Sequence, residues 1–118
     1  MCHADKSLTK TDSAGKEKSL FVDESIFDKS IHRYLGCNGC HTDVLAEPHA
    51  TPPGKVDCGI CHADALKLYQ EGFHGQKKLE GVVDAPACKD CHTYHNTRKV
   101  DDPEADTYRK NQPEMCAK

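Results

Sequence analysis

The sequence predicts a small, mainly α-helical protein with much irregular loop and little or no sheet, organised by something other than an apolar core. Only 36% of the 118 residues are apolar, while 30% are charged. This composition offers too little apolar surface to offset the entropy of ordering the backbone. Eight cysteines and eight histidines are its unusual part, so these residues are the first candidates for what replaces the core.

The chain begins with polar sequence. Residues 4–20 are rich in Lys, Ser and Thr, with a glycine in the middle, which predicts a surface loop or hairpin. Residues 20–22 form a short, strand-like apolar patch.

A first helix is expected to begin near Asp23 or Ser25, either of which can cap it, and to run to about Leu35. Apolar residues recur there at approximately helical spacing, and Gly36 stops the helix. We therefore expect His32 on a helix, just ahead of the first cysteine pair.

The middle of the chain alternates loop and helix. Residues 47–54 contain three prolines, so they predict a rigid irregular loop that presents His49. A second helix is expected over residues 63–70, closing at Gly72 near His74.

The last third is expected to be mostly loop. Residues 76–86 predict a loop with a short extended piece at 82–83, and residues 91–95 predict a short helical turn that holds two imidazoles. Beyond residue 98 the sequence is charged, which predicts a solvated loop with one short helix at about 104–110.

Three cysteine pairs share one spacing and one following residue. Residues 37–41, 58–62 and 88–92 each read C-x-x-C-H, the attachment signature of c-type haem. Two thiols about one turn apart can add to the two vinyl groups of the haem, and the next imidazole reaches the iron. The predicted attachment sites are Cys37 and Cys40, Cys58 and Cys61, and Cys88 and Cys91, with His41, His62 and His92 as proximal ligands.

Other uses of paired cysteines explain the pattern less well. A tetrahedral zinc site needs two pairs for each ion, and three pairs with three adjacent histidines fit no simple count. A disulfide framework gives no reason for a histidine after every pair. A redox dithiol protein can contain C-x-x-C-H, but it carries one such motif in a chain rich in apolar strands. This chain has three motifs and is not rich in apolar strands.

Four histidines remain as candidate distal ligands, which would make each iron six-coordinate. We expect about one of the four to be an ordinary surface residue. Residues 27–32 and 69–74 match each other, because each stretch begins with an aromatic residue, has a small residue two places before its end, and ends in histidine. The four candidates are His32, His49, His74 and His95.

Incomplete motifs stand near both ends. Cys2 and His3 resemble the tail of a further motif, and Cys116 resembles the head of another. The chain could be a segment of a longer multihaem protein or one repeat of an array. It could also be a whole protein in which Cys2 and Cys116 form a disulfide, or in which Cys2 alone attaches a haem. We favour a four-haem unit, because four motif histidines would match the four spare ones.

The three motifs, with residues 27–32 ahead of the first and residues 91–95 in the last, resemble the multihaem c-type cytochromes of bacterial and archaeal respiratory chains. The resemblance covers residues 20–98. It implies a small multihaem cytochrome fold organised around close-packed, covalently bound haems with mostly bis-histidine ligation. It also implies a periplasmic or extracellular location and exchange of electrons with redox partner proteins, including other multihaem cytochromes or copies of this chain.

These features predict electron transfer rather than catalysis, since an iron held by two imidazoles has no open position for a substrate. The alternative is a module of a multihaem reductase of small oxyanions such as nitrite, and a gas sensor or carrier would likewise need an open iron. The net charge of -3 argues against nucleic acid as a partner, and the absence of a long apolar run argues against membrane insertion. We expect one domain over residues 1–118, folded with three or four haems and largely unfolded without them.

Overall fold

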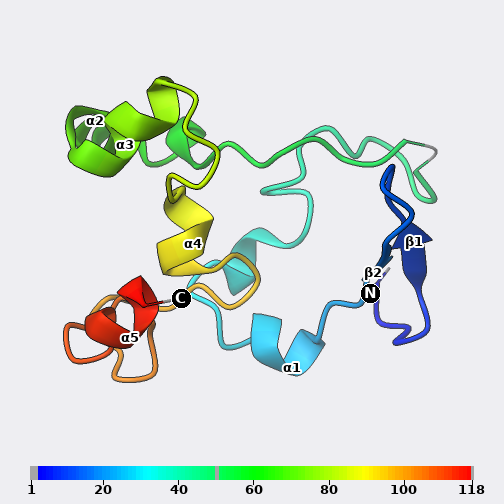
Figure 1. The fold of residues 1–118 in the computed structure, drawn as a ribbon. Helices are drawn as coiled ribbons and strands as arrows, with labels where there is room; N and C mark the ends of the chain where they lie inside the picture. Colours follow the sequence, from blue (N-terminus) through cyan, green and yellow to red (C-terminus); the bar gives the residue numbers. More distant parts are fainter. Residues whose placement is uncertain (1–2, 50, 118) are drawn as a thin grey trace.

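The computed structural model describes residues 3–49 and 51–117 (Figure 1). Short helices joined by long irregular segments make up most of these residues, with one two-stranded sheet beside them. The mainly helical prediction is thereby confirmed at the level of fold class. The elements are β1 (Thr9–Thr11), β2 (Glu17–Ser19), α1 (Glu24–Phe27), the 3-10 turns η1 (Arg33–Leu35) and η2 (Cys58–Ile60), α2 (Ala63–Glu71), α3 (Phe73–Leu79), α4 (Cys88–His92) and α5 (Gln112–Cys116).

The polar N-terminal stretch forms the expected hairpin. β1 and β2 pair antiparallel, with Thr9 opposite Ser19. Gly15 takes a φ of 78° in the connecting turn, a conformation that glycine adopts without strain. Residues 20–22 are not a strand; two of their backbone N–H groups bond to carbonyls of the irregular segment before β1.

The first helix is shorter than predicted. α1 ends at Phe27, and His32 lies in the turn just before η1. The N–H of Ile31 donates to the carbonyl of Thr97 at 2.8 Å, whereas in a helix it would bond to Phe27. The hydroxyl of Ser30 donates to the same carbonyl. The prediction of one continuous helix is wrong because hydrogen bonds to a distant loop replace those of its second turn.

α2 begins and ends close to the predicted positions, but a further helix follows it. α3 starts immediately after Gly72 and packs back against α2 (Figure 1). The loop predicted for residues 76–86 is therefore wrong over its first part, and His74 lies within α3. Gly75 permits this close approach, because a Cβ at that position would lie 2.0 Å from the backbone oxygen of Tyr69.

α4 contains the third C-x-x-C-H motif. It ends at His92, and the next residue, Thr93, takes a φ of 60°. His95 follows the helix, so the prediction of one turn that holds both imidazoles is wrong.

The helix predicted at 104–110 does not form. The side-chain amide of Asn111 donates to the carbonyls of Pro103 and Ala105, both at 2.9 Å, and these bonds hold the segment as a series of turns. α5 begins only after it, and Pro113 lies in its first turn, where proline is tolerated.

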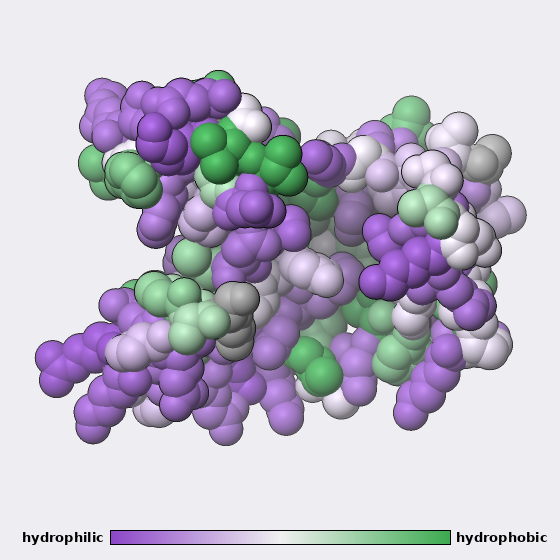
Figure 2. Space-filling view, in the orientation of Figure 1, coloured by the Kyte–Doolittle hydropathy of each residue, from purple (hydrophilic) through white to green (hydrophobic). Residues whose placement is uncertain are grey.

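The side chains form almost no core of their own. In the described residues the buried apolar side chains are Ala85 and Ala105, and Ser30 is the buried polar one. The chain exposes 9303 Å², against about 6,400 Å² expected for a folded protein of this mass. Figure 2 shows the surface hollowed between the α2–α3 lobe and the α5 lobe. No helix in the described ranges is long and apolar enough to cross a membrane.

Gly75→Ala tests the contact between α2 and α3. Alanine normally favours a helix over glycine, but here its Cβ would collide with the backbone of Tyr69. We expect a loss of about 1–3 kcal/mol of stability, measured as the melting temperature of the purified protein. Gly72→Ala is the matched control, because its Cβ would meet the nearest atom at 3.4 Å. Equal melting temperatures for the two variants would contradict the packing.

Candidate functional site

Each of the three C-x-x-C-H motifs folds into a single helical turn. In the first two motifs the N–H of the histidine donates to the carbonyl of the first cysteine, His41 to Cys37 and His62 to Cys58, both at 2.9 Å. The third motif is α4 itself. One turn therefore carries both thiols and the following imidazole, as covalent attachment of haem requires.

Carboxylates cap the second and third of these turns. Asp57 accepts a hydrogen bond from the N–H of Gly59 at 2.8 Å, and Asp90 accepts one from the N–H of Ala87 at 2.8 Å. The bond from Ala87 is the main reason that the pKa of the Asp90 carboxyl lies below its usual value. Both caps satisfy backbone donors that a short helix leaves unpaired.

The cysteines of the three motifs lie near one another. Burial raises the pKa of the Cys58 thiol, and the neighbouring thiols of Cys88 and Cys40 raise it further. Burial also raises the pKa of Cys91, with a contribution from Cys116. Charge interactions fade over about 10 Å, so these effects indicate that cysteines from all three motifs, and the one on α5, share one region.

His3 and His49 face each other with nearly parallel rings. Their centroids are 6.0 Å apart at an interplanar angle of 18°. The Nδ1 of His3 bonds to the carbonyl of Leu20, and the Nδ1 of His49 bonds to that of Thr51, both at 2.9 Å. A carbonyl partner makes Nδ1 the protonated nitrogen and leaves Nε2 available, which is how metal-ligating histidines are usually held. Cys2, the predicted attachment residue beside His3, lies outside the described residues.

Two further histidine pairs have similar spacing. The ring centroids of His32 and His62 are 5.8 Å apart, and those of His41 and His95 are 6.5 Å apart. Two imidazoles on opposite sides of one metal ion have centroids about 6 Å apart, given a metal–nitrogen distance of about 2.0 Å. Two aromatic rings that pack directly on each other have centroid distances in the same range. These pairs, however, each join a motif histidine to a spare one from a distant part of the chain.

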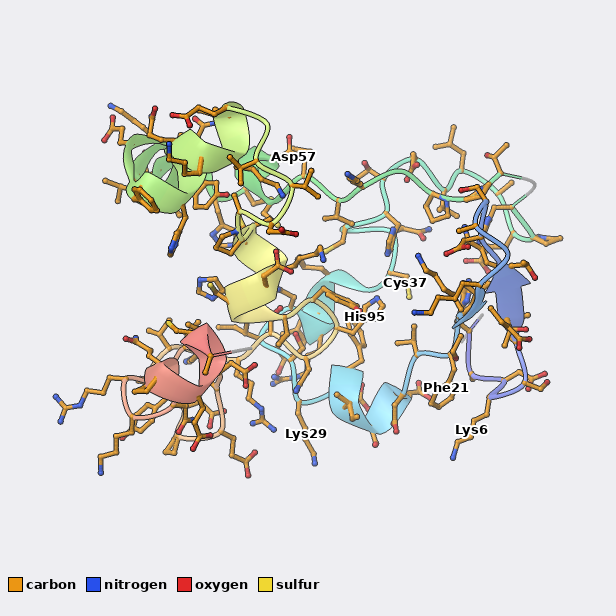
Figure 3. All side chains as sticks on the ribbon, viewed as in Figure 1. Lys6, Phe21, Lys29, Cys37, Asp57 and His95 are labelled. Carbon is orange, nitrogen blue, oxygen red and sulfur yellow. The ribbon has the colours of Figure 1, made fainter. Side chains whose placement is uncertain are left out.

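The pair His41 and His95 is half-buried. Burial lowers the pKa of His95, and the nearby rings of His41 and His3 lower it further. The Nδ1 of His41 is a buried atom without a hydrogen-bond partner in the described part of the chain, and such atoms are uncommon in proteins. Figure 3 shows Cys37 and His95 near the middle of the structure, from separate segments.

The structure does not bring His74 and His92 into ring contact. Among the described residues, the ring that lies against His74 is that of its neighbour Phe73, with centroids 6.0 Å apart. Both histidines are exposed. The third motif is therefore the one whose histidine has no imidazole facing it.

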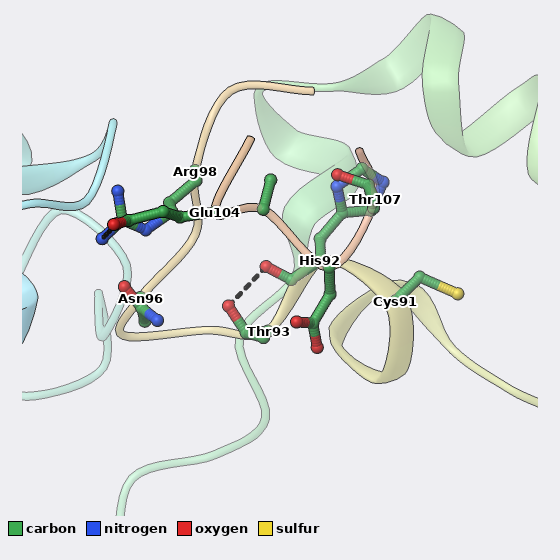
Figure 4. Close-up of a pocket in the computed structure, with 9 residues that line it drawn as sticks. Cys91, His92, Thr93, Asn96, Arg98, Glu104 and Thr107 are labelled. Carbon is green, nitrogen blue, oxygen red and sulfur yellow. Dashed lines mark hydrogen bonds and ion pairs between the residues drawn. The ribbon is translucent and has the colours of Figure 1, made fainter. Parts of the chain in front are cut away.

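His92 instead lines a small pocket with Arg98 and Glu104 (Figure 4). The Arg98 guanidinium is ion-paired with Asp102 at 2.8 Å and with Glu104 at 2.7 Å. The positive charge in the pocket is thus already balanced by carboxylates of the same loop.

Sequence reasoning missed the role of Ser30 and Thr97. Their contact joins the turn before His32 to the loop after His95. The small residue two places before the histidine, shared by residues 27–32 and 69–74, was the available signal, but its distant partner was not visible in the sequence.

In residues 3–49 and 51–117, no three His, Cys, Asp or Glu side chains are grouped so that they could hold a metal ion by themselves; six of the eight histidines meet in pairs. Comparison with family models, curated proteins and solved structures finds no match to this chain.

Asp90→Ala tests the cap of α4. We expect a loss of about 1 kcal/mol at pH 7, as for other helix caps. Because the folded-state pKa of Asp90 is lowered, its contribution is complete above the ordinary aspartate pKa of about 3.9. It is lost as the pH falls through the folded value.

The measurement is the difference in melting temperature between wild type and variant from pH 3 to pH 8. We expect this difference to be constant above about pH 5 and to shrink below about pH 4. The exposed Asp101→Ala variant controls for the general loss of a negative charge. A difference independent of pH would show that the carboxylate is not the capping group.

Proposed function

We propose that this chain is an electron-transfer protein that binds haem c at its three C-x-x-C-H motifs and holds irons between paired imidazoles. The observation that carries the proposal is that two motif histidines each lie opposite a spare one, His62 opposite His32 and His41 opposite His95, with centroids 5.8 and 6.5 Å apart. His3, which follows Cys2 in the incomplete motif, lies opposite His49 at 6.0 Å. Each pair combines one histidine that follows a cysteine with one that does not. Three of the four predicted distal histidines, all except His74, belong to such a pair.

The surroundings of the motifs fit a flat, apolar ring. Ile60, inside the second motif, is 71% exposed, and Tyr94, between His92 and His95, is 67% exposed. Leu35, just before the first motif, is 52% exposed. Contact of such side chains with a porphyrin would remove their apolar area from water. It would also supply the buried apolar contacts that the polypeptide lacks, so that haem binding and folding are coupled.

When bound, haem supplies one-electron oxidation and reduction at iron. The cysteines of each motif would hold the group covalently, and the paired imidazoles would ligate its iron. The carbonyl partners of His3 and His49 keep those rings in one orientation and one tautomer. An iron held by two imidazoles would have no position for a substrate, so the paired histidines support electron transfer rather than bond-making chemistry.

The pairing links different motifs. His32 precedes the first motif but faces His62 of the second, and His95 follows the third motif but faces His41 of the first. A segment beside one motif therefore supplies an imidazole for the haem of another motif. This supports short distances between the haems and transfer of electrons from one haem to the next.

The alternative, reduction of a small oxyanion, would need an open iron and a free cation. The pocket beside His92 is the best place for it, but Arg98 there is paired with two carboxylates. His74 lies against Phe73 in the structure, and as the one predicted distal histidine outside the pairs we propose it for the haem of Cys88 and Cys91. Redox proteins, including related cytochromes or further copies of this chain, are the proposed partners, in the periplasm or outside the cell.

The test is the intact mass of the protein purified from a host that attaches haem c, together with its ferric EPR spectrum with and without cyanide. We expect a mass increase of at least three haems that survives acidified organic solvent, and low-spin signals that cyanide does not change quickly. Colourless protein, or a high-spin component that binds cyanide, would overturn the proposal.

Double variants test the pairing itself. If His32 and His62 ligate one iron, His32→Ala removes one low-spin haem from the spectrum, and the double variant His32→Ala with His62→Ala still removes only one. The matched double variant His32→Ala with His41→Ala removes two, because its positions belong to different pairs. The reverse pattern in quantitative EPR would show that His32 serves the haem of its sequence neighbours.

A further inference from the structure

Ser30 is the one polar side chain that is fully buried in the described residues, at 0% exposure. This burial is unusual in a chain where even large apolar side chains are exposed. A buried hydroxyl is costly unless its hydrogen bonds are made, and here they are made to two separate parts of the backbone.

The Oγ of Ser30 donates to the carbonyl of Thr97 at 3.1 Å, 67 residues away, and accepts from the N–H of His32 at 3.2 Å. The N–H of Ile31 also donates to the Thr97 carbonyl, at 2.8 Å. The Thr97 hydroxyl in turn donates to the carbonyl of Tyr94 at 3.0 Å. A continuous set of hydrogen bonds thus runs from His32 to the residue before His95.

The two histidines at the ends of this set belong to different pairs. His32 faces His62, and His95 faces His41. The remaining pair, His3 with His49, has its own carbonyl partners at Leu20 and Thr51. Ser30 therefore lies where its hydrogen bonds connect to two of the three pairs, and within the described residues none of them reaches the third.

We propose that Ser30 is a positioning residue that orients the distal imidazoles of two haem irons at once, through its contacts with His32 and Thr97. The inference rests on the proposed function. Without the hydroxyl, the His32 N–H loses its acceptor and the two loops keep only the bond from Ile31 to Thr97. Both imidazoles then leave their irons more readily, because each is attached to a loop that is less firmly held.

Ser30→Ala is the test variant, because alanine fits the same space and removes only the hydroxyl. Ser25→Ala is the matched control, since the Ser25 hydroxyl bonds locally to Asp23 on the exposed surface of α1. The readout is the rate at which excess cyanide replaces an axial imidazole in the ferric holoprotein, followed optically and by EPR for each haem class.

We expect cyanide to bind two haems of Ser30→Ala about tenfold faster than in wild type, the effect of one lost buried hydrogen bond. The haem between His3 and His49 should bind cyanide at the wild-type rate, and Ser25→Ala should match wild type throughout. Equal rates in the two serine variants, or acceleration at one haem only, would overturn the role of Ser30.

Wild-type protein that is high-spin or binds cyanide at once would instead refute the proposed function, so the two failures are distinguishable. Hydrogen exchange of wild-type holoprotein gives a second measurement that needs no variant. We expect the backbone amides of Ile31 and His32 to exchange at least tenfold more slowly than unstructured amides of the same sequence. Exchange at the unstructured rate would contradict the contact with Thr97.

Discussion

Very little apolar surface is removed from water in this chain, and the rest of the structure depends on that constraint. The buried apolar side chains in the described residues are two alanines, which contribute little to stability. Distant segments are joined instead by single hydrogen bonds, such as Ile31 to Thr97 and Tyr69 to Pro86, and by imidazoles that meet in pairs. Contacts of this kind would stabilise the fold if a large group, such as covalently bound haem, packed against the segments that they join.

The pairing of the histidines suggests why the haems would bind as a set. His32 and His95 each lie beside one motif and face the histidine of another, so these two pairs connect segments that belong to different motifs. Loss of one haem would then loosen a loop that serves its neighbour. The contact between Ser30 and Thr97 adds a second connection between the same loops.

Local features were predictable because they depend on nearby residues. The hairpin of β1 and β2, and α2 with its end at Gly72, follow from turn residues, caps and spacing within a few positions. The errors have a common cause. α1 stops early because Thr97 supplies the acceptor for Ile31, and α3 extends the helical region because Gly75 allows it to lie against Tyr69.

The cysteine spacing and the histidine after each pair predict the chemistry of the site, since two thiols and an imidazole on one turn are a local property of five residues. They could also name the candidate distal histidines, but not their partners. The partners depend on which loops approach each other across sequence separations such as 30 residues between His32 and His62 or 54 between His41 and His95. Distant loops are joined by bonds such as those from the Ile31 N–H and the Ser30 hydroxyl to the Thr97 carbonyl, and the sequence does not show which distant carbonyl accepts them.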